Sequence, residues 1–271
     1  MAATDTKHGF ARPEMFSEAL AGSSKLDFSR HVFVAWGKAE EWPGEMPDGC
    51  AEGSLPQVLG GVVKSASKAG GQKVKLTFVE ATEDFPEGDV LVFPDYLRLR
   101  ACRPGTPGVQ ALEALLSGKK APGASGDVED IAGGFVFVCA HRQRDERCGH
   151  CGPALVDSLR GVPETKGMQV MKCSHVGGHK FAGNIITFSG KDARDDGHWY
   201  GYVTPESAAQ VVSGCAARGP LWRGRLGLSE AAAIRERRLQ QAKDAAPFVA
   251  AAAVAAAAVV AIGCYLGRRQ K

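Results

Sequence analysis

The chain has 271 residues, 44% of them hydrophobic and 23% charged, with 33 Lys+Arg against 30 Asp+Glu. A chain of this composition can form a globular core, which excludes a wholly disordered chain and a fibrous repeat. Three basic residues lie in the last four positions, so the rest of the chain carries no net charge. A neutral body gives no electrostatic basis for nucleic-acid binding, and we expect none.

The first half of the chain predicts a small α/β unit. We expect residues 1–27 to be a loose N-terminal lead-in and residues 28–100 to form an N-terminal α/β lobe. Apolar spacing predicts a strand, a helix and two further strands in this lobe, at residues 31–36, 55–69, 73–79 and 89–93. Residues 101–132 contain several Pro and Gly and are interpreted as the connection to a second lobe.

Residues 133–228 are expected to form that second lobe. Its predicted order is a strand, a helix and three strands, at residues 135–139, 153–160, 168–172, 185–188 and 198–203. Both lobes thus begin with strand, helix, strand, strand. This agreement is explained equally well by an old duplication and by the commonness of small α/β units.

The C-terminal part is predicted to be a charged helix over residues 229–244 and a transmembrane tail anchor over residues 245–267. Residues 245–266 carry no charge, and a helix of that length spans roughly 33 Å, enough for a hydrocarbon core of about 30 Å. A soluble alanine-rich helix is the alternative. An anchor this close to the basic C-terminus would insert after synthesis, and we expect the body to face the cytosol. A mitochondrial or plastid outer membrane is favoured, with the endoplasmic reticulum second.

Cysteine and histidine gather in residues 139–179, which hold four of the eight Cys and four of the seven His. Cys139 and Cys148 flank a loop after a predicted strand, and His175 and His179 lie in a glycine-rich loop between strands. Thiolate and imidazole are ligands that soft and borderline metals prefer. Two such pairs form a four-ligand site that suits zinc or an iron–sulfur cluster, and their spacing does not choose between the two.

The C-x-x-C pair Cys148 and Cys151 allows a competing interpretation. It follows a strand and precedes a helix, as in thioredoxin-like oxidoreductases, where the helix N-terminus lowers the pKa of the first thiol. The protein would then be a thiol–disulfide oxidoreductase. This hypothesis leaves His175 and His179 without a function.

At these residues the sequence resembles the sucrase/ferredoxin-like family, also described as thioredoxin-like ferredoxins with bis-histidinyl [2Fe–2S] ligation. The resemblance extends from about His31 to Leu226 and is carried by VFVCAHRQRDERCGHCGP, CSHVGGHKFAGN, HWYGYVTPE and LWRGRLG. It implies an α/β fold of two thioredoxin-like lobes, the second of them a ferredoxin domain. It also implies one [2Fe–2S] cluster, with one iron held by thiolates and the other by imidazoles, on Cys139, Cys148, His175 and His179.

That ligand set implies an electron carrier rather than an enzyme with its own substrate. Neutral imidazoles in place of two thiolates raise the reduction potential, and their second nitrogens allow an electron and a proton to move together. No flavin or nicotinamide fingerprint is present, so we expect a protein redox partner, a reductase that the sequence does not identify. A zinc-stabilised adaptor protein is the remaining alternative.

Several other side chains near the four ligands are not expected to be ligands. We expect Cys151 and Cys173 to lie beside the ligands, where they support the site or hold a spare redox role. The arginines of the ligand loop are expected to offset the charge of the cluster, to bind an acidic partner, or to be solvated; they are Arg142, Arg144 and Arg147.

Overall fold

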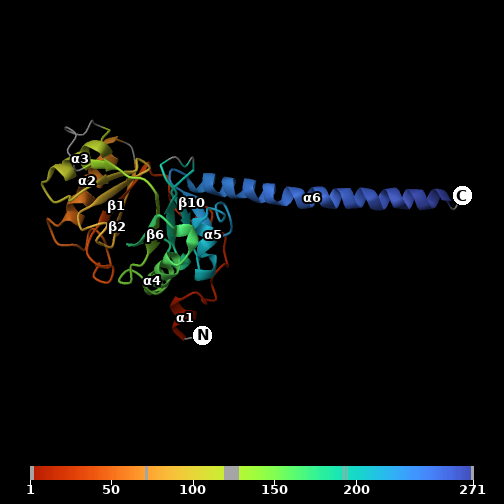
Figure 1. Ribbon diagram of the computed structural model, residues 1–271, viewed down its shortest axis with the longest axis horizontal. Helices are drawn as coiled ribbons and strands as arrows, with labels where there is room; N and C mark the ends of the chain where they lie inside the picture. Colours follow the sequence, from red (N-terminus) through yellow and green to blue (C-terminus); the bar gives the residue numbers. More distant parts are fainter. Residues whose placement is uncertain (1–2, 71–72, 119–127, 192, 194, 270–271) are drawn as a thin grey trace.

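The computed structural model describes residues 3–70, 73–118, 128–191, 193 and 195–269. Over these residues the chain is a mixed α/β structure in which ten strands form one sheet (Figure 1). The strands are β1 (Arg30–Ala35), β2 (Val74–Val79), β3 (Val90–Phe93), β4 (Leu97–Leu99), β5 (Val128–Asp130), β6 (Gly134–Cys139), β7 (Met168–Cys173), β8 (Ile185–Phe188), β9 (His198–Tyr200) and β10 (Trp222–Arg225). The helices are α1 (Ala3–His8), α2 (Leu55–Gly70), α3 (Pro107–Leu116), α4 (Glu146–Arg160), α5 (Ala208–Val212) and α6 (Glu230–Arg269), with short 3-10 helices η1 (Pro163–Thr165), η2 (His179–Phe181) and η3 (Pro205–Ser207).

The two halves of the described chain repeat one order of elements. The first half runs β1, α2, β2, β3, β4, α3, β5, and the second runs β6, α4, β7, β8, β9, α5, β10. In the first half β1 is parallel to β2 and antiparallel to β3, and in the second β6 is parallel to β7 and antiparallel to β8. The sheet order is β10-β9-β8-β6-β7-β2-β1-β3-β4-β5, so the strands of the second half form one side of the sheet and those of the first half form the other.

The halves join where β2 runs antiparallel to β7, at the pair Val79 and Cys173. Backbone hydrogen bonds extend this junction on both sides, from Ser174 N to Phe78 O at 2.7 Å and from Glu80 N to Lys172 O at 3.0 Å. The two units thus share one sheet, although the sequence predicts two separate lobes.

The sheet curls so that its two halves face each other. Phe33 on β1 stacks on Phe137 on β6 with ring centroids 3.8 Å apart, and Phe93 on β3 stacks on Phe188 on β8 at 3.9 Å. Two strands separate β1 from β6, which would place them roughly 14 Å apart in a flat sheet. Ring contact across that span requires the sheet to fold over a shared aromatic core.

Helices cover the outer faces of the curled sheet. In the first half α2 and α3 pack on the sheet over a cluster that includes Val32, Leu59 and Leu112. In the second half α4 and α5 pack over a cluster that includes Val138 and Leu155 (Figure 1). Each half is therefore a three-layer arrangement of helices, sheet and the shared core.

The N-terminal residues run along the second half of the body. They bury Met15, Leu20 and Leu26, although the sequence predicts a loose lead-in over residues 1–27. Glycine at position 22 adopts a φ of +79° and donates its N–H to Arg223 O at 3.0 Å. This segment is therefore part of the folded body and reaches the strand that carries Arg223.

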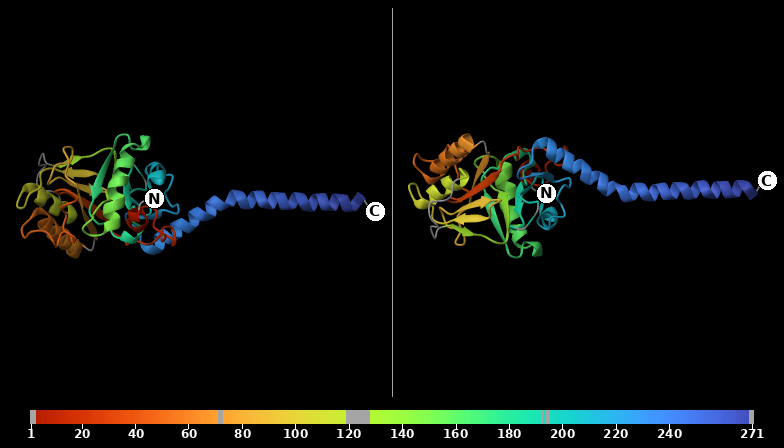
Figure 2. Two further views of the ribbon diagram at one scale, coloured as in Figure 1. Left: turned by 90° about the horizontal axis from the view of Figure 1, so that it is seen from below. Right: turned by 90° about the horizontal axis from the view of Figure 1, so that it is seen from above.

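The C-terminal residues form one helix, α6, which projects from the body and bends along its length (Figure 2). Among the described residues no helix is both long enough and apolar enough to cross a membrane. The predicted transmembrane tail anchor over residues 245–267 is therefore wrong, as is the fold class that included it. Alanine dominates this segment. Alanine is the strongest helix former but contributes little apolar area, so the absence of charge over this length was not enough to predict a membrane span.

Replacing Phe137 with alanine tests the shared aromatic core. Phe137 is fully buried, so its loss is expected to lower the free energy of unfolding by about 3–5 kcal/mol, measured by urea denaturation. Phe248→Ala is the control, because that side chain is 77% exposed and its loss is expected to change stability by no more than about 0.5 kcal/mol. Similar effects of the two substitutions would contradict the packing described above.

Candidate metal centre

The cysteine–histidine residues gather at the edge of the sheet where β6 and β7 end. Cys139 is the last residue of β6 and pairs in register with Cys173, the last residue of β7. Because the two strands are parallel, the segments that follow them leave the sheet at the same edge. One of these segments leads to Cys148 in α4, and the other contains His175 and His179.

Helix α4 begins so that Cys148 lies in its first turn. The carboxylate of Asp145 caps the helix by accepting a hydrogen bond from Arg147 N at 3.0 Å. A Cβ atom at Gly152 would lie 2.5 Å from the carbonyl oxygen of Cys139, so only glycine lets α4 pack this closely against the end of β6. The cap and the glycine together bring Cys148 to Cys139.

Three donor groups meet here. The sulfurs of Cys139 and Cys148 and a ring nitrogen of His175 lie within 4.8 Å of one another, and Cys139 Sγ is 4.0 Å from His175 Nδ1. Both cysteines are buried and His175 is half-buried. His179 lies outside this group; its exposed ring is centred 5.5 Å from that of His175. The arrangement brings three of the four predicted ligands together and leaves the fourth beside them at the surface.

The two buried thiols have pKa values that are shifted in opposite directions. A hydrogen bond from Cys148 lowers the pKa of the Cys139 thiol well below its ordinary value, and His175 contributes in the same direction. The same hydrogen bond raises the pKa of Cys148 well above its ordinary value. Two thiols and an imidazole so close together form a donor set that suits a soft or borderline metal ion.

The first half of the chain contributes to the support of the site through His141. His141 Nδ1 accepts a hydrogen bond from the backbone N–H of His175 at 3.2 Å, and Nε2 donates to Pro43 O at 2.9 Å. Trp42 packs edge-on against the same ring, with centroids 5.7 Å apart. Burial lowers the pKa of His141, consistent with a neutral ring that both accepts and donates. Sequence reasoning missed this role, because Trp42 and Pro43 are distant in sequence from the cluster.

A cavity of about 290 Å³ opens beside His175 between the two halves. Its lining includes the His141 ring, Ser174 and the loop that carries Glu45 and Asp48. The site can therefore be approached from solvent on the histidine side, whereas the two sulfurs are covered.

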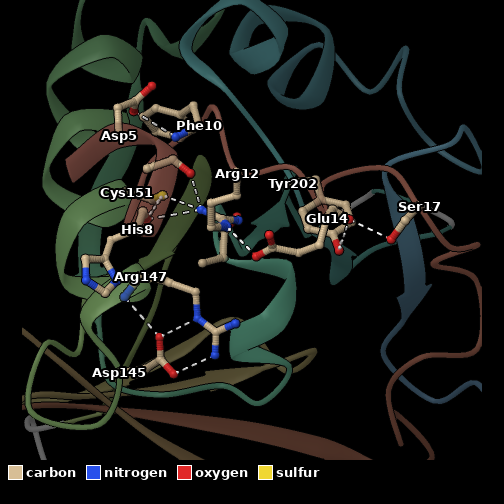
Figure 3. Close-up of polar contacts among 12 residues, drawn as sticks. Asp5, His8, Phe10, Arg12, Glu14, Ser17, Asp145, Arg147, Cys151 and Tyr202 are labelled. Carbon is tan, nitrogen blue, oxygen red and sulfur yellow. Dashed lines mark hydrogen bonds and ion pairs between the residues drawn. The ribbon is translucent and has the colours of Figure 1, made fainter. Parts of the chain in front are cut away.

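Cys151 lies on α4, beneath the N-terminal segment. Its sulfur accepts a hydrogen bond from Arg12 Nη1 at 3.3 Å and donates one to His8 O at 3.4 Å (Figure 3). Arg12 Nη2 donates to Ala182 O at 2.9 Å, so the buried arginine connects α4 to the segment after the histidines. Burial raises the pKa of Cys151, the direction opposite to that of a reactive thiol.

Cys173 is fully buried on the inner face of the sheet. Burial raises the pKa of its thiol well above the ordinary value. It lies in the same cluster of apolar residues as Phe33 and Phe137, where it packs as a small apolar side chain.

The arginines of the ligand loop are all paired with carboxylates. Arg142 pairs with Glu146 at 2.9 Å, Arg144 with Glu45 at 3.1 Å, and Arg147 with Asp145 at 2.9 Å. Their charges are therefore largely neutralised by neighbouring acids.

Comparison with known proteins identifies a family and several relatives that this chain resembles. The sucrase/ferredoxin-like family matches residues 20–225. A Debaryomyces hansenii relative named "Altered inheritance of mitochondria protein 32" is 42% identical over 86 residues, which cover 31% of this chain and 31% of that protein. The protein of the same name from Eremothecium gossypii is 40% identical over 84 residues, covering 29% and 27%. The matched region thus spans less than a third of these curated relatives.

Among solved structures, a thioredoxin-like [2Fe–2S] ferredoxin from Aquifex aeolicus matches with 16% identity and a TM-score of 0.23, over 32% of this chain and 83% of that one. The fold and the site define an α/β protein with a cysteine–histidine centre at the edge of its sheet. Because the family match covers most of the sequence, the chain belongs to the sucrase/ferredoxin-like family. This confirms the resemblance stated from the sequence.

Replacing Gly152 with alanine tests the close approach of α4 to Cys139. The added methyl group meets backbone atoms, so we expect a loss of unfolding free energy on the order of 1–3 kcal/mol in urea denaturation, despite alanine's higher helix propensity. Gly61→Ala is the matched control in α2, where nothing lies within 4 Å, and should stabilise by about 0.5–1 kcal/mol. Stabilisation of both variants would contradict the proposed packing.

Proposed function

We propose that this protein is a [2Fe–2S] electron-transfer protein whose cluster is held by Cys139, Cys148, His175 and His179. The observation that carries the proposal is the meeting of two buried thiols and one imidazole within 4.8 Å, in a chain of the sucrase/ferredoxin-like family. The donor set fits the group, because thiolate and imidazole are both ligands of [2Fe–2S] centres. When bound, the cluster would accept and return one electron.

The fourth ligand, His179, would have to join the site from its exposed position. It begins η2 directly after Gly178, whose φ is +72°. His179 is one short turn from His175, and their rings are 5.5 Å apart between centroids. The proximity of the two rings supports ligation by both imidazoles, and the exposure of His179 would leave its free nitrogen near solvent, where protons can exchange.

The burial of the sulfurs supports electron transfer over thiol–disulfide exchange. Cys148 and Cys151 are both fully buried, and Cys151 is held by Arg12 and His8 O. An exchange reaction needs an accessible thiolate. The hydrogen bond to Cys139 raises the pKa of Cys148, and burial raises the pKa of Cys151. We therefore assign these two residues to ligation and to support of α4.

The cellular location of the protein and the source of its electrons are two further parts of this proposal. Two fungal relatives are named for altered inheritance of mitochondria, and we propose that this chain also acts in association with mitochondria. We further propose that a protein reductase supplies its electrons. The histidine side of the site, beside the loop of Glu45, is the face it would approach.

The metal content of the full chain tests the proposal. Protein purified without oxygen is expected to be brown and to contain about two irons per chain, measured by visible absorption and by iron and zinc analysis. A colourless protein with one zinc would support the zinc-stabilised adaptor instead. Cys151→Ser is the control, because it should keep the iron and the colour if Cys151 is not a ligand.

Variants of the two histidines test whether their imidazoles bind the cluster. His175→Cys and His179→Cys should retain a cluster but alter its absorption and lower its midpoint potential, because a thiolate adds negative charge. His150→Cys is the matched control on α4, where the ring lies 3.9 Å from Asp5, and should leave the spectrum unchanged. Unchanged spectra in both ligand variants would contradict ligation by the imidazoles.

The pH dependence of the midpoint potential tests the coupling of electron and proton transfer. A histidine ligand whose second nitrogen reaches solvent should bind its proton more tightly when the site is reduced. The potential is then expected to fall as the pH rises, measured by redox titration at several pH values. A potential that is flat with pH and close to about −400 mV, as in plant-type ferredoxins, would contradict this coupling.

A further inference from the structure

Two cations lie inside the body near the metal centre without a carboxylate partner. Arg223 on β10 is only 1% exposed, and Lys75 on β2 is half-buried, with its ammonium 6.0 Å from the centre of the Trp199 ring. Among the described residues, neither side chain forms an ion pair with a carboxylate, and the hydrogen-bond partners of Arg223 are Ser23, Gly177 and Asn184. A buried charge without an opposite charge is costly, so its retention requires an explanation.

The contacts of Arg223 are all with neutral groups. Nη1 donates to Gly177 O at 3.0 Å and to Asn184 Oδ1 at 2.7 Å. Nε donates to Ser23 Oγ at 3.2 Å, and the guanidinium lies over the Phe181 ring at 5.1 Å. These contacts fix the position of the group and satisfy its N–H donors, but they leave its positive charge uncompensated.

Arg223 is also connected to two of the proposed ligand segments. Asn184 accepts from Arg223 and donates to Gly178 O at 3.0 Å, in the loop between the two histidines. The carbonyl of the same Asn184 accepts from Cys139 N at 3.0 Å. One arginine thus fixes the histidine loop relative to the strand that carries the first cysteine.

Both cations are destabilised by burial and stabilised by the cysteines of the site. Burial lowers the pKa of Arg223 to about 10, and negative charge on Cys139 and Cys148 acts in the opposite direction. Burial likewise lowers the pKa of Lys75, with repulsion from Arg223 in the same direction and Cys173 and Cys139 opposing it. The geometry places both cations beside the cysteine strands: Arg223 is joined through Asn184 to Cys139 N, and Lys75 lies on β2, which pairs with β7 at Val79 and Cys173.

We propose that Arg223 and Lys75 are built-in counter-charges of the metal centre, and that Arg223 in addition positions the histidine loop. This inference rests on the proposed function. With two thiolates and two neutral imidazoles as ligands, one electron from a protein reductase takes the oxidised site from neutral to one negative charge. The two fixed cations favour that reduced state, which raises the affinity of the site for the electron.

The test is a redox titration of the full chain carrying its cluster, with dithionite as reductant and visible absorption as the readout. Arg223→Gln removes the charge and keeps an amide donor, and is expected to shift the midpoint potential downward. Arg223→Lys keeps the charge and should shift it less. Arg225→Gln is the matched control on the same strand, because Arg225 pairs with Glu236 at 3.1 Å and with Asp195 at 3.5 Å. Its loss is expected to leave the potential unchanged.

Lys75→Met provides a second route if Arg223→Gln does not retain a cluster. No hydrogen bond or ion pair is found for the Lys75 ammonium among the described residues, so this variant removes charge and keeps the aliphatic stem. A downward shift in Lys75→Met, or in Arg223→Gln but not Arg225→Gln, supports the inference. Intact clusters with wild-type potentials in both variants, or an equal shift in Arg225→Gln, would overturn it and leave the proposed function standing. An iron-free wild-type chain would overturn both.

Discussion

The face-to-face packing of the two half-sheets builds the body that carries the candidate metal centre. Phe33 stacks on Phe137 and Phe93 on Phe188, across strands that a flat sheet would hold far apart. Aromatic rings bury large apolar areas, so this contact strongly favours the curled sheet. The loop of Trp42 and Pro43 contacts His141, beside a site whose candidate ligands all come from the second half.

The repeated topology shows why one half carries the site. Cys139 pairs with Cys173 at the ends of β6 and β7, and Ala35 pairs with Val79 at the ends of β1 and β2. Ala35 thus stands where the second half has Cys139, so the equivalent edge of the first half lacks that candidate ligand thiol. The first half instead supports the site, through Pro43 O and Trp42 on His141.

Sequence patterns predicted the local part of this structure. Apolar periodicity indicated most strands and the helix α2, and the density of Cys and His indicated the site. The long-range contacts could not be predicted, because Trp42, Lys75 and Arg223 have no local pattern that distinguishes them from ordinary core or strand residues. The C-terminal segment shows the converse error, since an uncharged alanine run gave a strong local signal that the structure does not support.

The central claim is that imidazole nitrogen and thiolate sulfur bind one cluster. Pulsed EPR of the dithionite-reduced full chain, labelled with ¹⁵N-histidine, measures this most directly. The account predicts strong hyperfine couplings from two histidine nitrogens, one of which is lost in each of His175→Cys and His179→Cys. A reduced cluster without histidine nitrogen coupling, or a metal centre without an EPR signal because it holds zinc, would contradict it.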